Sequence, residues 1–474
     1  MPIPSFSGLE TALSGLEAAQ AELNTTSNNI SNESTPGYSR EEVQTSPTGS
    51  LPLLTSGTSG HGAQLGEGVT VDDVTRVRDQ FLDVQYRTQN STSNSSSTLY
   101  NILNQVQTAL GESDGTGLST ALNNFWSAWN DLGQGSTLAS QQEVLSQAAT
   151  VANALNQLSS QLTTIENQVY SPNGSTVEGQ FNALTAYQGD SAGDANGPVA
   201  SDATQIANLN GEIARAEASG ASPNSLLDQR DSLIDDLSQY ANVAVAQQGN
   251  GMVNVSFGNA AANPAADDTP LVEGTNANPS TNLNFTNLTY QSGGTLGALA
   301  SLHDPNNPGN PQTLANYASS LDQVATQLTS QVQTALGGAG STQFFINSGN
   351  PPAAATGAAN IEVNPALSTG TGWPYSTVNT GSLTAGSSAA QQTYEALVTQ
   401  IGTNVQSANA DQTTQQSLLT AIGNQRESVS GVSLDEEMTN MITYQQAYQA
   451  SARVMSAIDD TLQTLISMGS SSGM

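Results

Sequence analysis

Few side chains in this sequence belong to the types that carry out catalytic chemistry. His61 and His303 are the only imidazoles, and each stands among glycine, proline or polar residues, which favours a solvated loop over a base or a metal ligand. Cysteine is absent, which excludes thiolate nucleophiles, disulfides and cysteine metal sites. No HExxH, P-loop or complete GxSxG pattern occurs, and Gly370-Thr371-Gly372 lacks the strand and helix that a phosphate-binding loop needs.

Paired carboxylates and clustered aromatic rings are the remaining candidates for chemistry. An acid/base pair or a calcium site requires carboxylates to converge, but among 40 acidic residues adjacent pairs arise by chance, so solvated faces are favoured. A cluster of Phe125, Trp126 and Trp129 near one helix face predicts a core plug in preference to a ligand platform. We therefore expect no enzyme, no cofactor and no metal site. The carboxylate pairs are Asp72-Asp73, Asp235-Asp236, Asp267-Asp268, Glu436-Glu437 and Asp459-Asp460.

Charge and hydropathy exclude two further classes of partner. The 474 residues include 40 acidic side chains against 8 arginines and no lysine, a net charge of -32, so nucleic acid and anionic membrane surfaces are disfavoured. No run of 18 apolar residues is present, which predicts no transmembrane helix. The first six residues lack the features of a cleaved secretory signal, so we expect a cytosolic protein or export by a route that needs no cleavage.

Both ends of the chain carry heptad repeats. Near the N-terminus, Leu9, Leu16, Leu23 and Ile30 recur every seven residues, with Ala12, Ala19 and Thr26 three positions after the first three. Near the C-terminus the repeat is Leu434, Met441, Tyr448, Met455 and Leu462, flanked by Met438 and Tyr444. A helix over residues 433–468 would span about 50 Å, beginning at Ser433 and ending at Gly469. Matching heptads predict that the ends pair, although an ordinary buried bundle helix is the alternative.

The middle of the chain predicts a helical body with β-rich additions. Residues 35–68 are predicted to form an irregular connector, followed by a strand around Val69 to Val74. Apolar residues recur at helical spacing in five ranges: 76–110, 138–170, 202–240, 314–336 and 389–429. Alternating apolar residues around Gly249-Asn250-Gly251 predict a hairpin, and residues 360–363 a strand.

The expected fold is mainly α, discontinuous and elongated, with a smaller β-rich inserted domain. Its N- and C-terminal helices pair in a coiled coil (1–60 and 430–474). A helical bundle forms the middle domain (61–242, 300–338 and 382–429). The β-rich outer insertion takes 243–299 and 339–381.

Several of these segments resemble flagellar axial proteins. The N-terminal residues are similar to the signature shared by rod, hook and hook-associated proteins: Ala12-Leu13-Ser14-Gly15-Leu16, Ser27-Asn28-Asn29-Ile30 and Thr35-Pro36-Gly37-Tyr38-Ser39-Arg40. The succession of proline and glycine predicts a tight turn here. Tyr38 and Arg40 are then expected to dock on neighbouring subunits or on the C-terminal helix, with local packing as the alternative. Residues 227–233, 430–437 and 444–453 resemble the branch of first hook-associated proteins, which join hook to filament.

The resemblance implies a structural subunit with defined partners. Such a subunit is exported unfolded by the flagellar type III apparatus and polymerises at the hook tip into a ring of about eleven copies. Its partners would be itself, the hook protein, the second junction protein and a cytosolic chaperone on the C-terminal helix, and its location the extracellular flagellum. Alternatives are the second junction protein, the hook protein, or a secreted enzyme on an axial scaffold, for which residues 242–381 show no zinc-protease motif.

The heptad residues are the candidate assembly interface. Because a lone pair of heptad stripes buries little apolar area, the ends can stay loosely ordered in the monomer and pack when neighbours arrive. Methionine adapts to several partners, so Met438, Met441, Tyr444 and Met455 are candidates for chaperone or inter-subunit contacts. The full set is Leu9, Leu13, Leu16, Leu23, Ile30, Tyr38, Arg40, Leu434, Met438, Met441, Tyr444, Tyr448, Met455 and Leu462.

Overall fold

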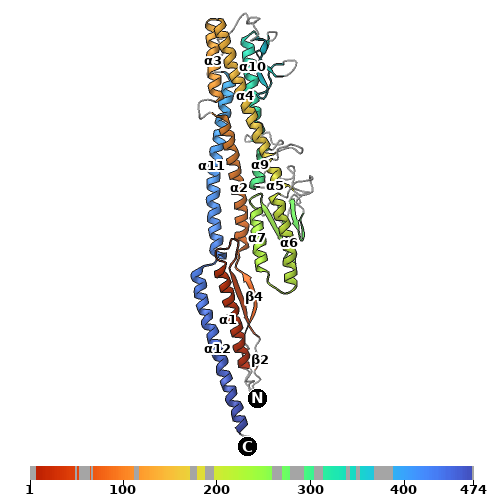
Figure 1. Ribbon diagram of the computed structural model, residues 1–474, viewed down its shortest axis with the longest axis vertical. Helices are drawn as coiled ribbons and strands as arrows, with labels where there is room; N and C mark the ends of the chain where they lie inside the picture. Colours follow the sequence, from red (N-terminus) through yellow and green to blue (C-terminus); the bar gives the residue numbers. More distant parts are fainter. Residues whose placement is uncertain are drawn as a thin grey trace.

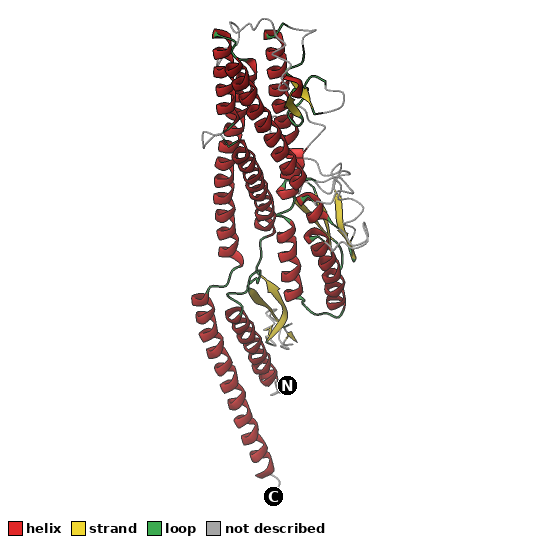
Figure 2. Ribbon diagram, turned by 45° about the horizontal axis from the view of Figure 1, so that its top comes forward, coloured by secondary structure: helices red, strands yellow, loops and turns green. Residues whose placement is uncertain are grey.

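The protein is an elongated, mainly helical rod with both chain ends at the same tip (Figure 1). The computed structural model describes residues 7–48, 51–52, 64–65, 68–111, 117–170, 179–186, 197–258, 269–277, 293–303, 313–337, 342–348, 353–367 and 388–471. His61, Asp267-Asp268 and Gly370-Thr371-Gly372 lie outside these ranges. Helices dominate and the strands form small antiparallel sheets (Figure 2), so the predicted mainly α class is confirmed.

The terminal helices form an antiparallel pair. Helix α1 (Ser7–Ser31) lies along α12 (Leu434–Ser471), as the matching heptads predict. The sequence placed the start of α12 correctly, but the helix continues past Gly469, where its end was expected. A Cβ at Gly15 would lie 3.2 Å from the hydroxyl oxygen of Ser451, so the two backbones approach closely there.

The seam between these helices is offset by one residue from the leucine heptad. Small residues form its centre on α1: Ala12 and Ala19 are buried, and a Cβ at Gly8 would meet Ile458 at 3.4 Å. The leucine series Leu9, Leu16, Leu23 and Ile30 is half-buried at the flank of the seam. The period was predicted correctly, and so were the small seam residues Ala12, Ala19 and Thr26, which are all buried. The leucines are displaced to the flank, because Gly8 and Gly15 leave room for the facing helix.

A β-ribbon runs along α1. Strand β1 (Glu41–Pro47) pairs antiparallel with β4 (Val69–Arg76), with a bulge at Gln44/Thr45, and β2 (Leu51–Pro52) pairs with β3 (Gln64–Leu65). The sequence predicted β4, but it assigned β1 to an irregular connector, which is wrong. That segment is polar and shows no strand pattern, and it becomes a strand only because β4 supplies the hydrogen-bonding partner.

The body above this tip is a helical bundle. Helices α2 (Gln80–Leu110) and α11 (Ala389–Ser430) pack together along their length. At the far end they join α3 (Leu118–Gln134), α4 (Leu138–Val169) and α10 (Leu314–Ala335), with α5 (Gln180–Thr185) and α9 (Gly294–His303) on the side.

Aromatic rings plug the far end of this bundle. Phe125, Trp126 and Trp129 are fully buried, and the rings of Phe344 and Phe345 pack against them. The centroids of neighbouring rings in this cluster lie between 4.8 and 6.1 Å apart. The predicted core plug is therefore confirmed.

Two further helices and a sheet cover one side of the body near its middle. Helices α6 (Pro198–Ala218) and α7 (Asn224–Leu237) break the predicted helical segment 202–240 at Gly220, whose φ is +79°. The sheet orders β5 (Val243–Gln247), β6 (Val253–Phe257), β7 (Thr269–Glu273) and β8 (Asn276–Ala277) consecutively. The predicted hairpin is present, with positive φ at Asn250 and Gly251.

A second small sheet lies apart from the first. It pairs β9 (Phe345–Asn347) with β10 (Ile361–Val363), followed by a short 3₁₀ helix, η3 (Pro365–Leu367). The sequence predicted one β-rich insertion over 243–299 and 339–381, whereas the described strands of these ranges form two sheets that share no strand. The sequence does not indicate which strands pair when the strands are far apart along the chain.

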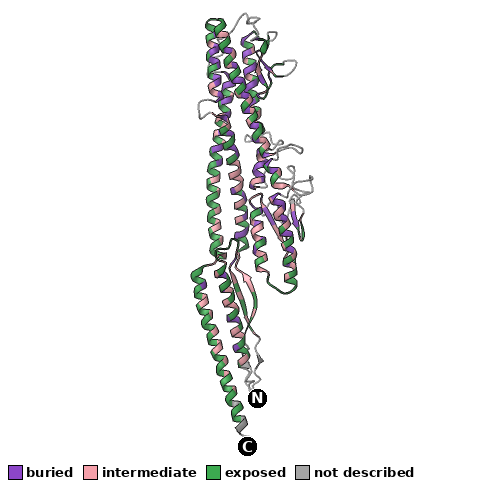
Figure 3. Cartoon of the chain, viewed as in Figure 1, coloured by how far each residue is buried: buried purple, intermediate pink, exposed green. Residues whose placement is uncertain are grey.

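Burial differs sharply between the body and the terminal pair (Figure 3). One continuous apolar core runs through the bundle and onto the sheet of β5 to β7. Within the described part of α12, Glu437 alone is fully buried, at 3% exposure. The buried residues of α1 are small or polar: Ala12, Ala18, Ala19, Thr26 and Asn29. The terminal helices therefore contact each other without enclosing a core of large apolar side chains. Across the described ranges, no helix combines the length and apolarity needed to cross a membrane.

Candidate functional site

Ion pairs from distant segments meet where the terminal pair leaves the body. Asp228, Asp231 and Asp235 lie on one face of α7, because the spacing i, i+3, i+7 keeps them aligned. We call the whole group the arginine–aspartate cluster: Arg76, Arg78, Arg87, Arg426, Asp83, Asp228, Asp231 and Asp235. It connects β4, α2, α7 and α11.

Asp231 is the centre of this cluster. Its carboxylate lies 2.8 Å from Arg76 and 3.1 Å from Arg78, and its other oxygen lies 3.5 Å from Arg87. Arg78 also donates two hydrogen bonds to Asp83, at 2.7 and 3.1 Å, in the fork geometry that favours a guanidinium over an ammonium.

The outer pairs of the cluster extend it to α2 and α11. Arg87 donates to Asp235 at 2.6 Å, and Arg426 pairs with the second oxygen of that carboxylate. Arg426 also lies 3.8 Å over the ring of Tyr86.

The charges in the cluster stabilise one another against burial. Burial alone would raise the pKa of Asp231, but Arg78, Arg76 and Arg87 outweigh it, so the pKa is lowered. Burial likewise acts to lower the pKa of Arg78, and Asp231 and Asp83 reverse that effect. Four guanidinium groups face four carboxylates, so the cluster has no net charge to attract a ligand. Its geometry is that of a structural joint.

The predicted tight turn lies directly beneath the cluster. The N–H of Tyr38 donates to the carbonyl of Thr35 at 3.2 Å, and Gly37 has a φ of +79°, as proline followed by glycine predicts. The next residue, Ser39, donates to Asp228 through both its N–H, at 3.0 Å, and its hydroxyl, at 2.8 Å. The turn is thereby tied to α7.

Tyr38 and Arg40 both make contacts within their own chain. The Tyr38 hydroxyl donates to the Asn29 side chain at 2.8 Å, and burial, reinforced by nearby carboxylates, raises the pKa of this phenol. Arg40 pairs with Glu436 at 3.0 Å, and its N–H donates to the carbonyl of Ser430 at 2.9 Å. Within one chain, Tyr38 therefore packs locally and Arg40 docks on the C-terminal helix, while docking of either residue on neighbouring subunits stays a prediction.

The candidate interface residues on α12 divide into two groups. Met441, Tyr444, Tyr448, Met455 and Leu462 are half-buried at the a and d positions of the seam, facing α1. Exposed apolar residues flank this seam on both sides, at the e positions Met438 and Ile466 and the g positions Val454 and Met468. Leu434 and Leu13 are exposed too.

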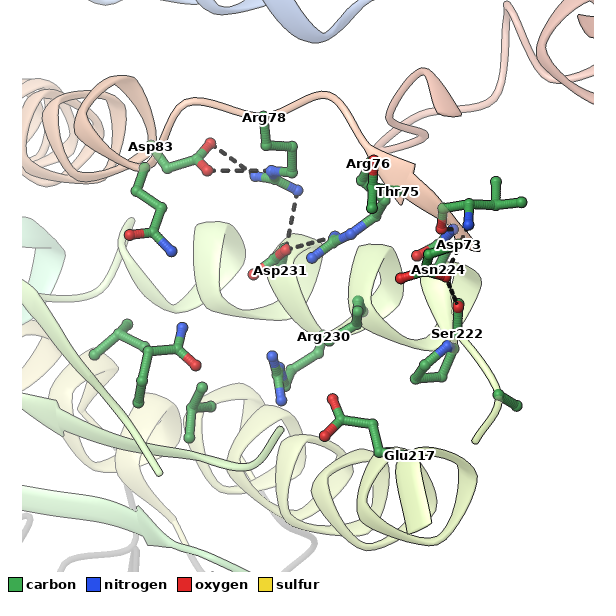
Figure 4. A pocket seen from close by; sticks show the side chains of 18 of the residues that line it. Asp73, Thr75, Arg76, Arg78, Asp83, Glu217, Ser222, Asn224, Arg230 and Asp231 are labelled. Carbon is green, nitrogen blue, oxygen red and sulfur yellow. Dashed lines mark hydrogen bonds and ion pairs between the residues drawn. The ribbon is translucent and has the colours of Figure 1, made fainter. Parts of the chain in front are cut away.

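A cavity of about 580 Å³ opens beside the cluster (Figure 4). Arg76, Arg78, Arg87 and Arg230 line it, together with four carboxylates, so its charges balance. Arg230 points into it, and its guanidinium donates to the Asn210 side chain at 3.1 Å and to the Gly251 carbonyl at 2.6 Å. These bonds fasten the hairpin of β5 and β6 to α7, which is a packing role.

The side chains that were weighed for chemistry do not build a catalytic or metal site. Solvated faces were the wrong prediction for two of the carboxylates, because Asp235 belongs to the arginine–aspartate cluster and Glu437 is buried and accepts a hydrogen bond from Asn29. His303 lies against the ring of Tyr170, with centroids 4.5 Å apart, and 3.7 Å from the carboxylate of Glu166. Asp72-Asp73 and Asp459-Asp460 are exposed. In the part of the chain that the structure describes, no group of three or more histidine or acidic side chains is arranged to hold a metal ion.

Comparison with known proteins assigns the chain to a family. Residues 103–343, just over half of the chain, match the model of the flagellar hook-associated protein FlgK helical domain. The chain belongs to the FlgK family. The ends match families of the flagellar rod: residues 9–38 match the flagella basal body rod protein, and residues 424–468 the C-terminal part of the rod FlgEFG proteins.

Relatives of FlgK type cover the chain to different extents. Flagellar hook-associated protein 1 of Bacillus subtilis is 28% identical over 98% of this chain and 98% of its own length. That of Salmonella typhimurium is 32% identical over 52% of this chain, which spans 40% of that longer relative. The solved structure of the flagellar hook junction protein FlgK from Burkholderia pseudomallei is similar with a TM-score of 0.40 and 23% identity, covering 57% of this chain and 46% of that one.

The family matches follow the division seen in the structure. The rod-like segments contain α1, the tight turn, the end of α11 and most of α12, whereas the FlgK segment contains α7 and most of the body. The arginine–aspartate cluster joins the two, because Asp231 lies in the FlgK segment and Arg426 in the rod-like one. The predicted resemblance to hook-associated proteins is confirmed.

The cluster itself was not predicted from the sequence. Residues 227–233 carry part of the family resemblance, but no role was assigned to the three aspartates of α7. Their spacing was the available signal, but the arginine partners stand between 144 and 191 positions away, as the pairs Asp231–Arg87 and Asp235–Arg426 show. Such pairs leave no local pattern.

Removal of the central carboxylate tests the joint. We expect Asp231→Asn to lower the free energy of unfolding by about 3–5 kcal/mol, because three arginines lose their shared partner in a buried setting. Urea unfolding followed by circular dichroism measures this loss. Glu436→Gln, which breaks the exposed pair with Arg40, should cost about 1 kcal/mol or less. Equal losses in the two variants would contradict a structural role for the cluster.

Neighbouring carboxylates on α6 and α7 make stability depend on pH. Burial, with a further contribution from Asp236, raises the pKa of Asp202 to about 6. A folded-state pKa above the unfolded value means that stability falls as pH rises from about 4 to about 6. Asp202→Asn should therefore raise Tm by roughly 1–3 °C at pH 7.5, and the gain should vanish near pH 4. The exposed Asp411→Asn is the control, and a gain independent of pH would refute this explanation.

Proposed function

We propose that this chain polymerises at the tip of the flagellar hook and forms the junction between hook and filament. Family membership supports a structural flagellar component, and the relatives carry the name hook-associated protein. The observation that carries the proposal is the terminal helix pair, which has apolar side chains on both flanks of its seam and encloses no core. A subunit in a tube wall needs a neighbour on each side, and these flanks offer both contacts.

Assembly would complete the packing of the terminal helices. Each copy leaves Met438, 58% exposed, and Ile466, 72% exposed, for one neighbour, and Val454 and Met468 for the other. Burying a large apolar side chain contributes about 1.5–3 kcal/mol, so a few such contacts per copy suffice once a ring closes. The ring is proposed to hold about eleven copies, with the hook protein below and the second junction protein above.

Export and chaperone binding are proposed on the same helix. The chain would leave the cell unfolded through the flagellar type III apparatus without signal cleavage and act in the extracellular flagellum. A cytosolic chaperone would reach Met438 in the folded pair, but it must separate α12 from α1 to reach Met441, Tyr444 and Met455. We further propose a structural and non-enzymatic role, with 1–60 and 430–474 as the polymerising domain, 61–242, 300–338 and 382–429 as the bundle, and 243–299 and 339–381 as outer additions.

A double substitution on one flank tests the proposal. Met438→Gln with Ile466→Gln should leave Tm unchanged, because both side chains are exposed, and reduce filament-bearing cells at least tenfold when the variant replaces the native copy. Filaments are counted by electron microscopy. Leu138→Gln with Leu418→Gln changes two equally apolar exposed residues on the body and should not affect attachment. Normal filaments in the first variant would contradict assembly through this flank.

A further inference from the structure

The tip of the hairpin between β5 and β6 carries an asparagine followed by a glycine. The strand ladder ends at the pair Gln247–Val253, so Asn250 and Gly251 lie beyond it, in the turn. Asn250 is exposed, and among the described residues it alone has a positive φ, +83°, without being a glycine. Its side-chain amide has no hydrogen-bond partner in the part of the chain that the structure describes. The amide carbon is therefore open to attack.

Asparagine before glycine is thermolabile, because glycine has no Cβ to shield its backbone nitrogen. That nitrogen attacks Cγ of the asparagine, a C–N bond closes a five-membered succinimide, and the side-chain nitrogen leaves as ammonia with the proton of the backbone N–H. Water then opens the ring at one of its two carbonyl carbons and leaves aspartate or isoaspartate. One ammonia is lost, one water enters, and nothing is oxidised or reduced.

The carboxylate of Glu217 lies directly against Gly251. A Cβ placed on Gly251 would overlap this carboxylate, so the space that a side chain would take holds the end of Glu217 instead. Glu217 comes from the end of α6 and points into the same cavity as Arg230 (Figure 4). Closure of the succinimide requires the Gly251 N–H to lose its proton, and a carboxylate in this place can accept it.

A second asparagine–glycine pair, in the interior of α6, shows the contrast. Asn210 is fully buried, and its side-chain nitrogen donates to the carbonyls of Val253, at 2.8 Å, and Gly274, at 2.7 Å. Its side-chain oxygen accepts a hydrogen bond from Arg230 at 3.1 Å. Both ends of that amide are thus restrained, and no other carboxamide in the hairpin turn is held in this way. Asn210 is therefore an internal reference for an unreactive pair.

We propose that Asn250 and Gly251 form a self-modification site, at which Asn250 converts to aspartate or isoaspartate with Glu217 as the base. Isoaspartate adds a methylene to the backbone, and either product adds a negative charge beside Glu217. The Gly251 carbonyl, which accepts a hydrogen bond from Arg230 at 2.6 Å, is then displaced, so the hairpin loosens from α7. This inference does not rest on the proposed junction function.

Incubation of the purified, full-length chain at neutral pH for several weeks tests the site. Samples taken over time are digested, and mass spectrometry with electron-transfer fragmentation separates asparagine, aspartate and isoaspartate at each position. We expect Asn250 to convert at least tenfold faster than Asn210. Conversion at Asn250 that is no faster than at Asn210 would overturn the proposal.

Matched variants test the base and the consequence. Glu217→Gln should slow the conversion of Asn250 at least threefold, whereas Glu212→Gln, the same change at another exposed position of α6, should leave the rate unaltered. Equal rates in these two variants would refute the role of Glu217. The aged native chain should have a lower Tm than the fresh one, and aged Asn250→Gln should not, since its ring closure is disfavoured. An unchanged Tm after complete conversion would contradict the loosening of the hairpin.

Discussion

The arginine–aspartate cluster is the interaction on which the arrangement of this molecule depends. The chain has a net charge of -32 and only eight arginines, and four of these arginines lie in the cluster. Asp231 and Asp235 bring β4, α2 and α11 onto α7 there. Because each charge in the cluster is paired, burial is tolerated, and because the pairing geometry is specific, it fixes how the terminal helices leave the body.

Stability is distributed unevenly on the two sides of this joint. Above it, a continuous apolar core runs from the ring cluster around Trp129 to the sheet below. Beneath it, the helix pair meets through small residues such as Gly15 and Ala19, so it buries little apolar area. Hydrophobic stabilisation scales with the apolar area buried, so we expect the terminal pair to be less stable than the body. That distribution suits the proposed function, in which the subunit is exported unfolded and then packs into a wall.

Sequence reasoning succeeded where the determining forces are local. The heptad period, the Thr35–Tyr38 turn, the hairpin at Asn250 and the start of α12 follow from rules that act over a few residues. The offset of the seam was not predictable, because the register of two helices depends on which side chains leave room for the partner. Strand β1 and the partners of Asp231 depend on contacts between distant segments, which the sequence does not display. The family resemblance, by contrast, identified the correct class from short motifs.

Amide hydrogen exchange on the purified, full-length chain tests the central claim most directly, namely that the terminal pair is marginally packed until neighbours cover it. The expected result is rapid exchange along α12 beyond the Glu437 contact and strong protection in α4 and α7, where the core and the cluster lie. Protection of α12 as strong as that of α4 in the isolated chain would contradict the account, because the helix pair would then be stable without an assembly partner.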